Sequence, residues 1–197
     1  MRNEDAFRDL VELIESARAF GYQETADGAR LFGRVPLVGA QAWLHVTYPG
    51  LDPDEMVELA DQIERPLASD YAWWLGRMNG ITLFSGALEF CGLVRVRSRS
   101  IGNRQPYDLM VEGEVQRRVL KAGPEMFFFG VTGVSLGSRF YLDARTGEVH
   151  RCARNSAKPL QSWSSIAELI STETPRLAKL FDKTGRCAVD NELIWTP

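Results

Sequence analysis

Residues 139–152 read RFYLDARTGEVHRC. The runs on either side of ARTG, 139–143 and 148–152, contain the aromatic and aliphatic residues that are typical of strands. Gly147 can adopt the positive φ that a short hairpin loop requires, because it carries no Cβ. The stretch therefore predicts an antiparallel β-hairpin.

More strands are expected before this hairpin. Apolar residues and arginines alternate over 93–97, as in a strand with one face in water. Residues 126–129 form a short apolar run that ends at Gly130, and apolar residues between 35 and 46 suggest one or two strands interrupted near Gly39. We therefore expect a sheet in the middle of the chain.

Helices are expected on both sides of these strands. A helix start combines a capping residue with an acid or a proline in the first turn. Such starts occur at Asn3, Asp52-Pro53-Asp54-Glu55, Ser165-Ile166-Ala167-Glu168 and Thr174-Pro175. A further helix should follow Pro66 and end at Asn79-Gly80, a pair suited to a left-handed cap. The order of helices, strands and helices predicts a single α+β domain over residues 1–197.

The charge balance excludes some function classes. Twenty-three Lys and Arg against 26 Asp and Glu give a net charge of −3 and a pI near 5.5, which disfavours a protein that coats nucleic acid. The cysteines, Cys91, Cys152 and Cys187, form no C-x-x-C pair, and the first residues lack an apolar leader, so a reducing cytoplasm is expected. No apolar run approaches the roughly 20 residues that cross a bilayer, so we expect no membrane partner.

Motifs that carry chemistry are few. The two histidines, His45 and His150, lie on expected strands and not near a cysteine at zinc-ligand spacing, which favours structural or surface roles. The sequence has neither a phosphate-binding G-x-x-x-x-G-K-[ST] loop nor a G-x-S-x-G serine elbow. We therefore expect a non-enzymatic protein with no cofactor and no metal. A small hydrolase is an alternative if acids such as Glu89 and Asp143 converge in a cleft.

Two charged stretches could bind a partner. A basic stripe could receive a phosphate or an acidic partner, or it could be a solvated strand face; it contains Arg95, Arg97, Arg99 and Arg104. The helix opened by Asp52 has an acidic face that could be merely solubilising or could steer a basic partner. The acidic candidates for partner contact are Asp54, Glu55, Glu58 and Asp61.

Trp73 is a further candidate for partner contact. It faces away from the apolar stripe of Tyr71, Trp74 and Leu75 on the expected helix after Pro66. It is therefore either covered by another element or exposed as part of an interface.

The order of these landmarks resembles the SUKH superfamily, which includes the fungal Smi/Knr regulators and many bacterial immunity proteins. The similar pieces are Pro66…Tyr71…Trp74-Leu75…Asn79-Gly80, Leu88-Glu89-Phe90-Cys91-Gly92, Phe128-Phe129-Gly130, Phe140-Tyr141-Leu142-Asp143…Thr146-Gly147-Glu148-Val149 and Trp163-Ser164-Ser165-Ile166-Ala167-Glu168-Leu169-Ile170. They cover residues 52–171, which leaves an N-terminal extension, 1–51, and a C-terminal helix and tail, 172–197. The sequence departs from the family pattern at Arg65, where the family has leucine, and at Ser165-Ile166, where it has serine and phenylalanine.

The resemblance implies a fold and a role. It implies an α+β fold with a central, mostly antiparallel sheet and helices packed at its side, and it implies no catalytic residues. Known members are largely binding modules, and many bacterial members neutralise a toxin of a polymorphic or contact-dependent system. The expected partner is thus a secreted toxin domain, with an intracellular regulatory scaffold of the Smi/Knr type as the alternative role.

Overall fold

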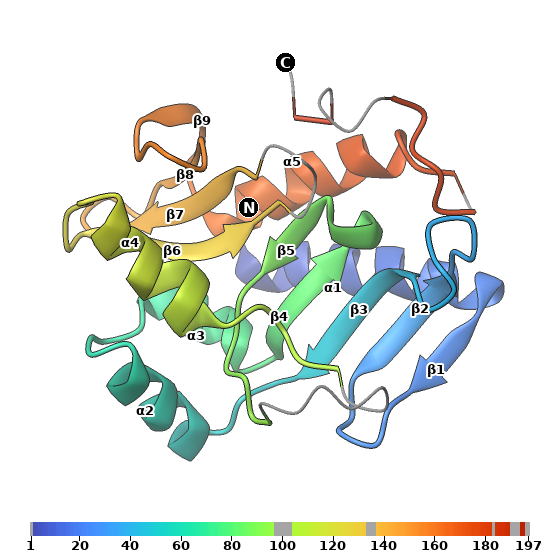
Figure 1. Ribbon diagram of the computed structural model, residues 1–197, viewed down its shortest axis with the longest axis horizontal. Coiled ribbons are helices and arrows are strands. Elements are labelled where there is room, and N and C mark those ends of the chain that lie inside the picture. Colours follow the sequence, from blue (N-terminus) through green and yellow to red (C-terminus); the bar gives the residue numbers. More distant parts are fainter. Residues whose placement is uncertain (1, 97–103, 133–136, 183, 190–193, 196–197) are drawn as a thin grey trace.

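One antiparallel sheet organises the computed structural model, which describes residues 2–96, 104–132, 137–182, 184–189 and 194–195. Among these residues, nine strands pair in chain order from β1 to β9, so each strand lies beside its neighbours in the sequence (Figure 1). The strands are β1 (Tyr22–Glu24), β2 (Arg30–Arg34), β3 (Trp43–Pro49), β4 (Met78–Leu83), β5 (Leu88–Phe90), β6 (Met126–Val131), β7 (Arg139–Asp143), β8 (Val149–Cys152) and β9 (Pro159–Trp163).

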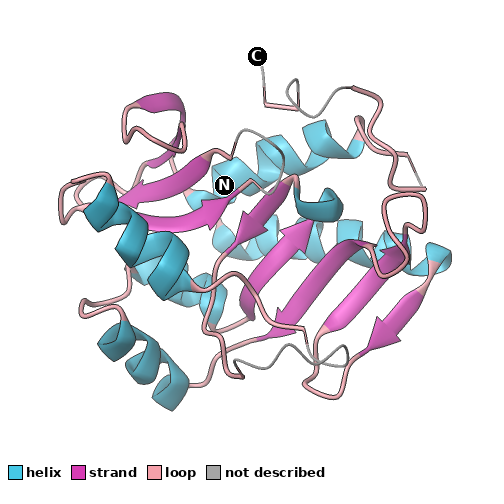
Figure 2. Cartoon of the chain, in the orientation of Figure 1, coloured by secondary structure: helices cyan, strands magenta, loops and turns pink. Residues whose placement is uncertain are grey.

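Helices precede, interrupt and follow the strands, as Figure 2 shows, and the fold is α+β. The α-helices are α1 (Asn3–Ser16), α2 (Pro53–Gln62), α3 (Ser69–Leu75), α4 (Gln116–Val119) and α5 (Ile166–Ala178). Two short 3-10 helices are η1 (Ala17–Phe20) and η2 (Phe84–Gly86), and a π-helix, η3 (Leu109–Val115), leads into α4. No helix in the described part of the chain is both long and apolar enough to span a membrane.

The main core lies between the sheet and the helices behind it. Figure 1 shows α1 and α5 behind the strands, and the two helices contact each other. Side chains from α1, α3, α5 and one face of the sheet form one continuous buried cluster, in which Leu10, Tyr71, Phe129 and Phe140 are fully buried. Burial of this apolar surface is the main source of stability for the fold.

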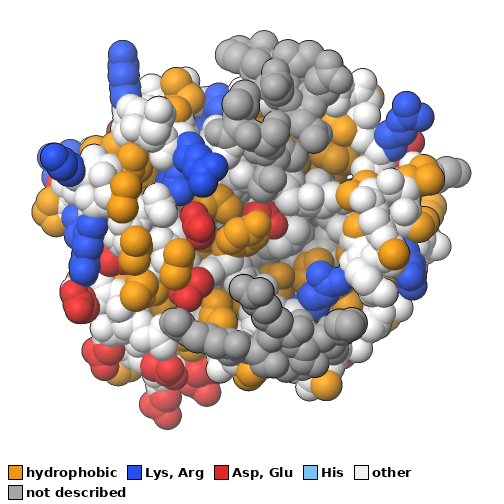
Figure 3. All heavy atoms as spheres, viewed as in Figure 1, with side chains coloured by type: hydrophobic (Ala, Val, Ile, Leu, Met, Phe, Trp, Pro, Cys, Tyr) orange, Lys and Arg blue, Asp and Glu red, His pale blue; other side chains and the backbone are white. Residues whose placement is uncertain are grey.

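The opposite face of the sheet, which we call the front face, carries η3 and α4 (Figure 1). Under these helices, Phe128, Tyr141 and Cys152 form a small buried cluster. A second small cluster on β2 and β3 includes Leu31 and Val46. The middle of this face is hollowed, as Figure 3 shows.

The hairpin and the capped starts of α2 and α5 are confirmed, whereas Asn3 is the first residue of α1 and does not cap it. The hairpin forms with Leu142 opposite Val149, and Gly147 has a φ of +79°. Asp52 accepts a hydrogen bond from the Glu55 backbone N–H, and the Glu55 side chain accepts one from the Asp52 N–H, which completes a capping box.

The expected end of the helix after Pro66 and the expected strand at 93–97 are both wrong, because contacts between residues far apart in the sequence determine the structure there. Asn79 and Gly80 lie in β4 and not at a helix end, since α3 ends at Leu75 and the Asn79 side chain pairs with the Leu93 backbone. Residues 93–96 are not a strand for the same reason, and residue 97 lies outside the described residues.

Two further expectations are corrected. Residues 35–42 form a loop between β2 and β3, and Gly39 lies in a turn of that loop and not within a strand. Thr174-Pro175 does not start a new helix, because α5 continues through Pro175. Buried Ile170 and Leu177 hold this segment in the main core, and packing overrides the missing backbone N–H of the proline.

The hairpin loop provides a test of backbone strain. A Cβ built on Gly147 would meet no atom within 4 Å, so a substitution there changes only the backbone energy. We expect Gly147→Val to lower the free energy of unfolding by about 1 kcal/mol or more, because a branched side chain disfavours positive φ. Gly147→Asn should lower the free energy of unfolding by less, since asparagine tolerates a positive φ. Denaturant unfolding of both variants measures the difference, and a wild-type midpoint for the valine variant would contradict the turn assignment.

Candidate functional site

The outward side of α2 carries three acidic side chains on one stripe. Asp54, Glu58 and Asp61 are exposed and lie about one turn apart, and Val57 is exposed between them. Within the described residues none of the three carboxylates has an ion pair, and Glu58 accepts only a hydrogen bond from Gln62. Figure 3 shows acidic side chains gathered at this edge of the molecule. We call Asp54, Val57, Glu58 and Asp61 the α2 acidic surface.

Glu55 does not belong to that surface, although the sequence grouped it there. Its carboxylate caps α2 and pairs with Arg95, whose Nη2 lies 2.8 Å from Glu55 Oε2. The hydrogen bond from Arg95 lowers the pKa of Glu55 and keeps the carboxylate charged. Arg95 also donates to the Gly50 carbonyl, so the pair fixes the start of α2 against the chain that follows β5. Glu55 thus positions the α2 acidic surface.

The basic stripe is only partly described. Arg95 is paired with Glu55, and Arg104 donates to the Gln41 carbonyl at 2.8 Å. Arg97 and Arg99 lie outside the described residues. The two described arginines therefore serve contacts within the chain.

Trp73, the remaining partner candidate, is half-buried on α3. The edge of its ring meets Phe7 of α1 at a centroid distance of 5.9 Å, and the Arg77 guanidinium lies 3.7 Å from its centroid. The side chain therefore contributes to the packing of α1 on α3 and leaves only part of its ring in solvent.

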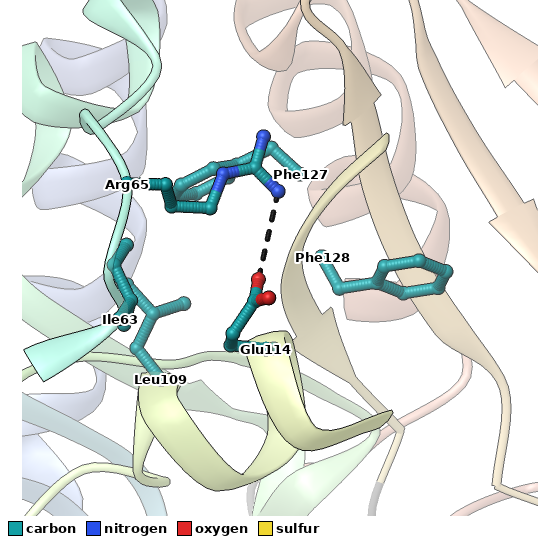
Figure 4. Close-up of a pocket in the computed structure, with 7 residues that line it drawn as sticks. Ile63, Arg65, Leu109, Glu114, Phe127 and Phe128 are labelled. Atoms are coloured by element: carbon teal, nitrogen blue, oxygen red, sulfur yellow. Dashed lines mark ion pairs between the residues drawn. The ribbon is translucent and has the colours of Figure 1, made fainter. Parts of the chain in front are cut away.

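Arg65, the departure from the family pattern, lines a small polar cavity with Glu114 (Figure 4). Its Nη1 lies 3.6 Å from Glu114 Oε2, and its guanidinium lies over the Phe127 ring at 5.2 Å. Glu114 also accepts hydrogen bonds from Arg117 and Arg118. The cavity of about 10 Å³ has room for roughly one water molecule, so this network links η3 to the α2–α3 connection and offers little space for a ligand.

The front face contains a more unusual group, the carboxylate of Glu89. Strand register aligns one residue from each of six neighbouring strands: Leu31, Val46, Thr82, Glu89, Val131 and Arg139. Directly opposed residues share a face of a sheet, so Glu89 lies on the front face between the two small clusters there. It is only 5% exposed.

Hydroxyl groups surround this carboxylate, and its charge is left uncompensated. Thr82 Oγ1 donates to Glu89 Oε1 at 3.2 Å, whereas Oε2 is buried without a hydrogen-bond partner among the described residues. The Tyr107 hydroxyl also interacts with this carboxylate. Burial raises the pKa of Glu89 to about 7; the Thr82 and Tyr107 hydroxyls act to lower it, and the nearby Glu112 carboxylate adds to the rise.

The two acids of the hydrolase alternative are not brought together. Asp143 is four residues along β7 from Arg139, which is about 13 Å at the rise of a strand. It pairs with Arg145 at 2.9 Å, and the hydrogen bond from Arg145 lowers its pKa. An acid–base pair of Glu89 with Asp143 therefore does not form.

The residues that surround Glu89 were not predicted from the sequence. Thr82, Tyr107 and Glu112 come from β4, a loop and η3, and only the pairing of the strands and the path of that loop bring them to Glu89. The one local signal is an acidic residue between Leu88 and Phe90 in an otherwise apolar strand.

No protein-family model matches the chain, and no curated protein matches it.

The raised pKa of Glu89 predicts how stability depends on pH. The folded chain holds this proton more tightly than the unfolded chain, because the pKa rises from 4.5 to about 7 on folding. Glu89 therefore lowers the free energy of unfolding as the pH rises through this range. We expect Glu89→Gln to be more stable than the wild type at about pH 8, by roughly 1–3 kcal/mol, and similar to it at about pH 4.

Urea denaturation at both pH values measures the difference. Glu58→Gln, at an exposed position of α2, serves as the control and should show no such pH-dependent gain. Equal stability of Glu89→Gln and the wild type at both pH values would contradict the buried, uncompensated carboxylate.

Proposed function

We propose that this chain is a protein-binding module without catalytic activity, and that its α2 acidic surface binds a basic surface of the partner protein. The observation that carries the proposal is the stripe of three exposed carboxylates that have no ion pair among the described residues. Charges of one sign on one helix face attract an oppositely charged protein and speed its association. Val57, 61% exposed within the stripe, adds apolar contact area.

The role we propose is immunity in the cytoplasm against a cognate protein toxin. The resemblance of residues 52–171 to the SUKH superfamily supports this role, because many bacterial members neutralise toxins. A toxin that acts on nucleic acid has a basic substrate-binding face, since that face must hold phosphates. An acidic helix can both steer to such a face and block it.

An intracellular regulatory scaffold of the Smi/Knr type is the alternative. A scaffold would also use an acidic surface, but it would bind host proteins and protect against no toxin. Coexpression with a toxin encoded by a neighbouring gene separates the two roles, because only an immunity protein restores growth. A small hydrolase has less support, since Glu89 and Asp143 lie apart on the sheet.

The α2 acidic surface can be tested by charge reversal. We expect Glu58→Lys with Asp61→Lys to slow association with a basic toxin by roughly tenfold and to flatten its dependence on salt. Folding should be little affected, because both residues are exposed on α2. Stopped-flow or surface-binding kinetics at several salt concentrations measure the effect.

A matched control reverses two exposed acids at the same spacing on α1, Asp9→Lys with Glu12→Lys. This control changes the net charge equally and should leave the association rate close to that of the wild type. If both pairs slow association equally, the effect belongs to net charge and not to α2. An unchanged rate and unchanged protection for the α2 pair would contradict the proposed surface.

A further inference from the structure

The two edges of the described sheet, β1 and β9, differ in how well they are protected. β9 begins with Pro159, and a register shift interrupts its pairing with β8. A proline and an irregularity at an edge both hinder the addition of another strand. β1 has neither, all of its residues are exposed, and its register with β2 is unbroken. Among the described strands, β1 is therefore the edge that is open to a further strand.

The hydrogen bonds between β1 and β2 show which backbone groups of β1 face outward. The Gly21 carbonyl accepts from the Gly33 N–H in β2 at 2.9 Å, and the Thr25 N–H donates at 2.9 Å to the residue that precedes β2. Backbone groups alternate in direction along an antiparallel strand, so those of Tyr22 and Glu24 point away from β2. No described group forms a hydrogen bond with the backbone N–H or carbonyl of Tyr22 or Glu24.

The side chains along this edge carry complementary charges. Tyr22 and Glu24 lie on the same face of the sheet, where the Tyr22 hydroxyl donates to Glu24 Oε2 at 3.1 Å. The Arg18 guanidinium lies 3.7 Å from the centroid of the Tyr22 ring. Arg18 pairs with Glu15 at 3.1 Å, yet 51% of its side chain is exposed, so it can contact a second carboxylate. The edge thus presents a carboxylate towards one end and a guanidinium towards the other.

We propose that β1 pairs with β1 of a second copy of this chain, antiparallel about a two-fold axis at Gln23. In this register Tyr22 of each copy lies opposite Glu24 of the other, and each such pair exchanges both of its backbone hydrogen bonds. Because Arg18 lies over Tyr22, each Glu24 carboxylate comes next to Arg18 of the other copy. The pairing therefore satisfies the outward backbone groups and the charges of the edge together.

The contact closes on itself, because a two-fold axis joins the same surface of both copies, so association should stop at the dimer. We expect a weak dimer, with a Kd of about 10–500 µM, since so short a ladder buries little surface. β1 and α2 lie at opposite sides of the view in Figure 1. The proposal is therefore separate from the α2 acidic surface and does not depend on the proposed function.

Sedimentation equilibrium of the full chain gives the stoichiometry and the Kd, and amide spectra of the ¹⁵N-labelled chain locate the contact. We expect a monomer–dimer equilibrium, with concentration-dependent shifts strongest at the Tyr22 and Glu24 N–H groups. Glu24→Pro removes an outward N–H and should weaken the dimer at least about tenfold. The control, Leu160→Lys, adds a charge at an exposed position of β9 and should leave the Kd unchanged.

An exchange of charges tests the same register without a proline, in case Glu24→Pro does not fold. Arg18→Glu alone and Glu24→Arg alone each bring like charges together across the axis and should weaken the dimer about fivefold or more. The double variant, Arg18→Glu with Glu24→Arg, restores opposite charges and should return the Kd to within about threefold of the wild type.

Three results would overturn the proposal at once: a wild type that stays monomeric up to about 1 mM, oligomers larger than a dimer, or loss of association in Leu160→Lys. The last of these would assign the contact to β9. Failure of the double variant to recover the affinity that the single variants lose would overturn the two-fold register of β1.

Discussion

The Tyr71 hydroxyl holds together the two halves of the sheet. β5 has three residues and is the only connection between β1–β4 and β6–β9 within the described sheet. Tyr71, fully buried on α3, donates to the Cys91 carbonyl and lies 3.3 Å from the Phe129 carbonyl, where the pairing of β5 with β6 ends. The Asn79 side chain extends the other edge by pairing with the N–H and the carbonyl of Leu93 at 2.7 and 2.8 Å. Two buried side chains thus replace the ladder that a longer strand would provide.

The position of β5 also determines which face of the sheet Glu89 occupies. Leu88 and Phe90 enter the main core, so the residue between them must point to the front face, and that residue is Glu89. The sheet therefore buries a carboxylate without a cationic partner among the described residues, while α2, held at its start by Glu55, presents its acids to solvent. The two acidic features differ in kind. The exposed one suits long-range attraction of a protein surface. The buried one makes the stability of the fold depend on pH, because burial raises its pKa to about 7.

The parts of the fold that could be predicted from sequence are those with local causes. The capping residues Asp52 and Ser165 start α2 and α5, and Gly147 turns the hairpin, because each of these interactions spans only a few residues. Asn79-Gly80 has the sequence of a helix end, but its partner is Leu93, and no local pattern reveals that contact. The acidic stripe of α2 was predictable for the same local reason, except for Glu55, whose partner Arg95 is 40 residues away. The environment of Glu89 could not be predicted from the sequence, because it depends on the register of the sheet.

The ionisation of Glu89 tests the central claim most directly, because it reports whether the sheet buries this carboxylate without a compensating charge. A carbon-detected NMR titration of the Glu89 side-chain carboxyl in the full chain gives its pKa without any mutation. The structure predicts a midpoint at about 7. A midpoint at the ordinary value of 4.5 would show that the carboxylate is solvated or paired, and would contradict this description of the front face.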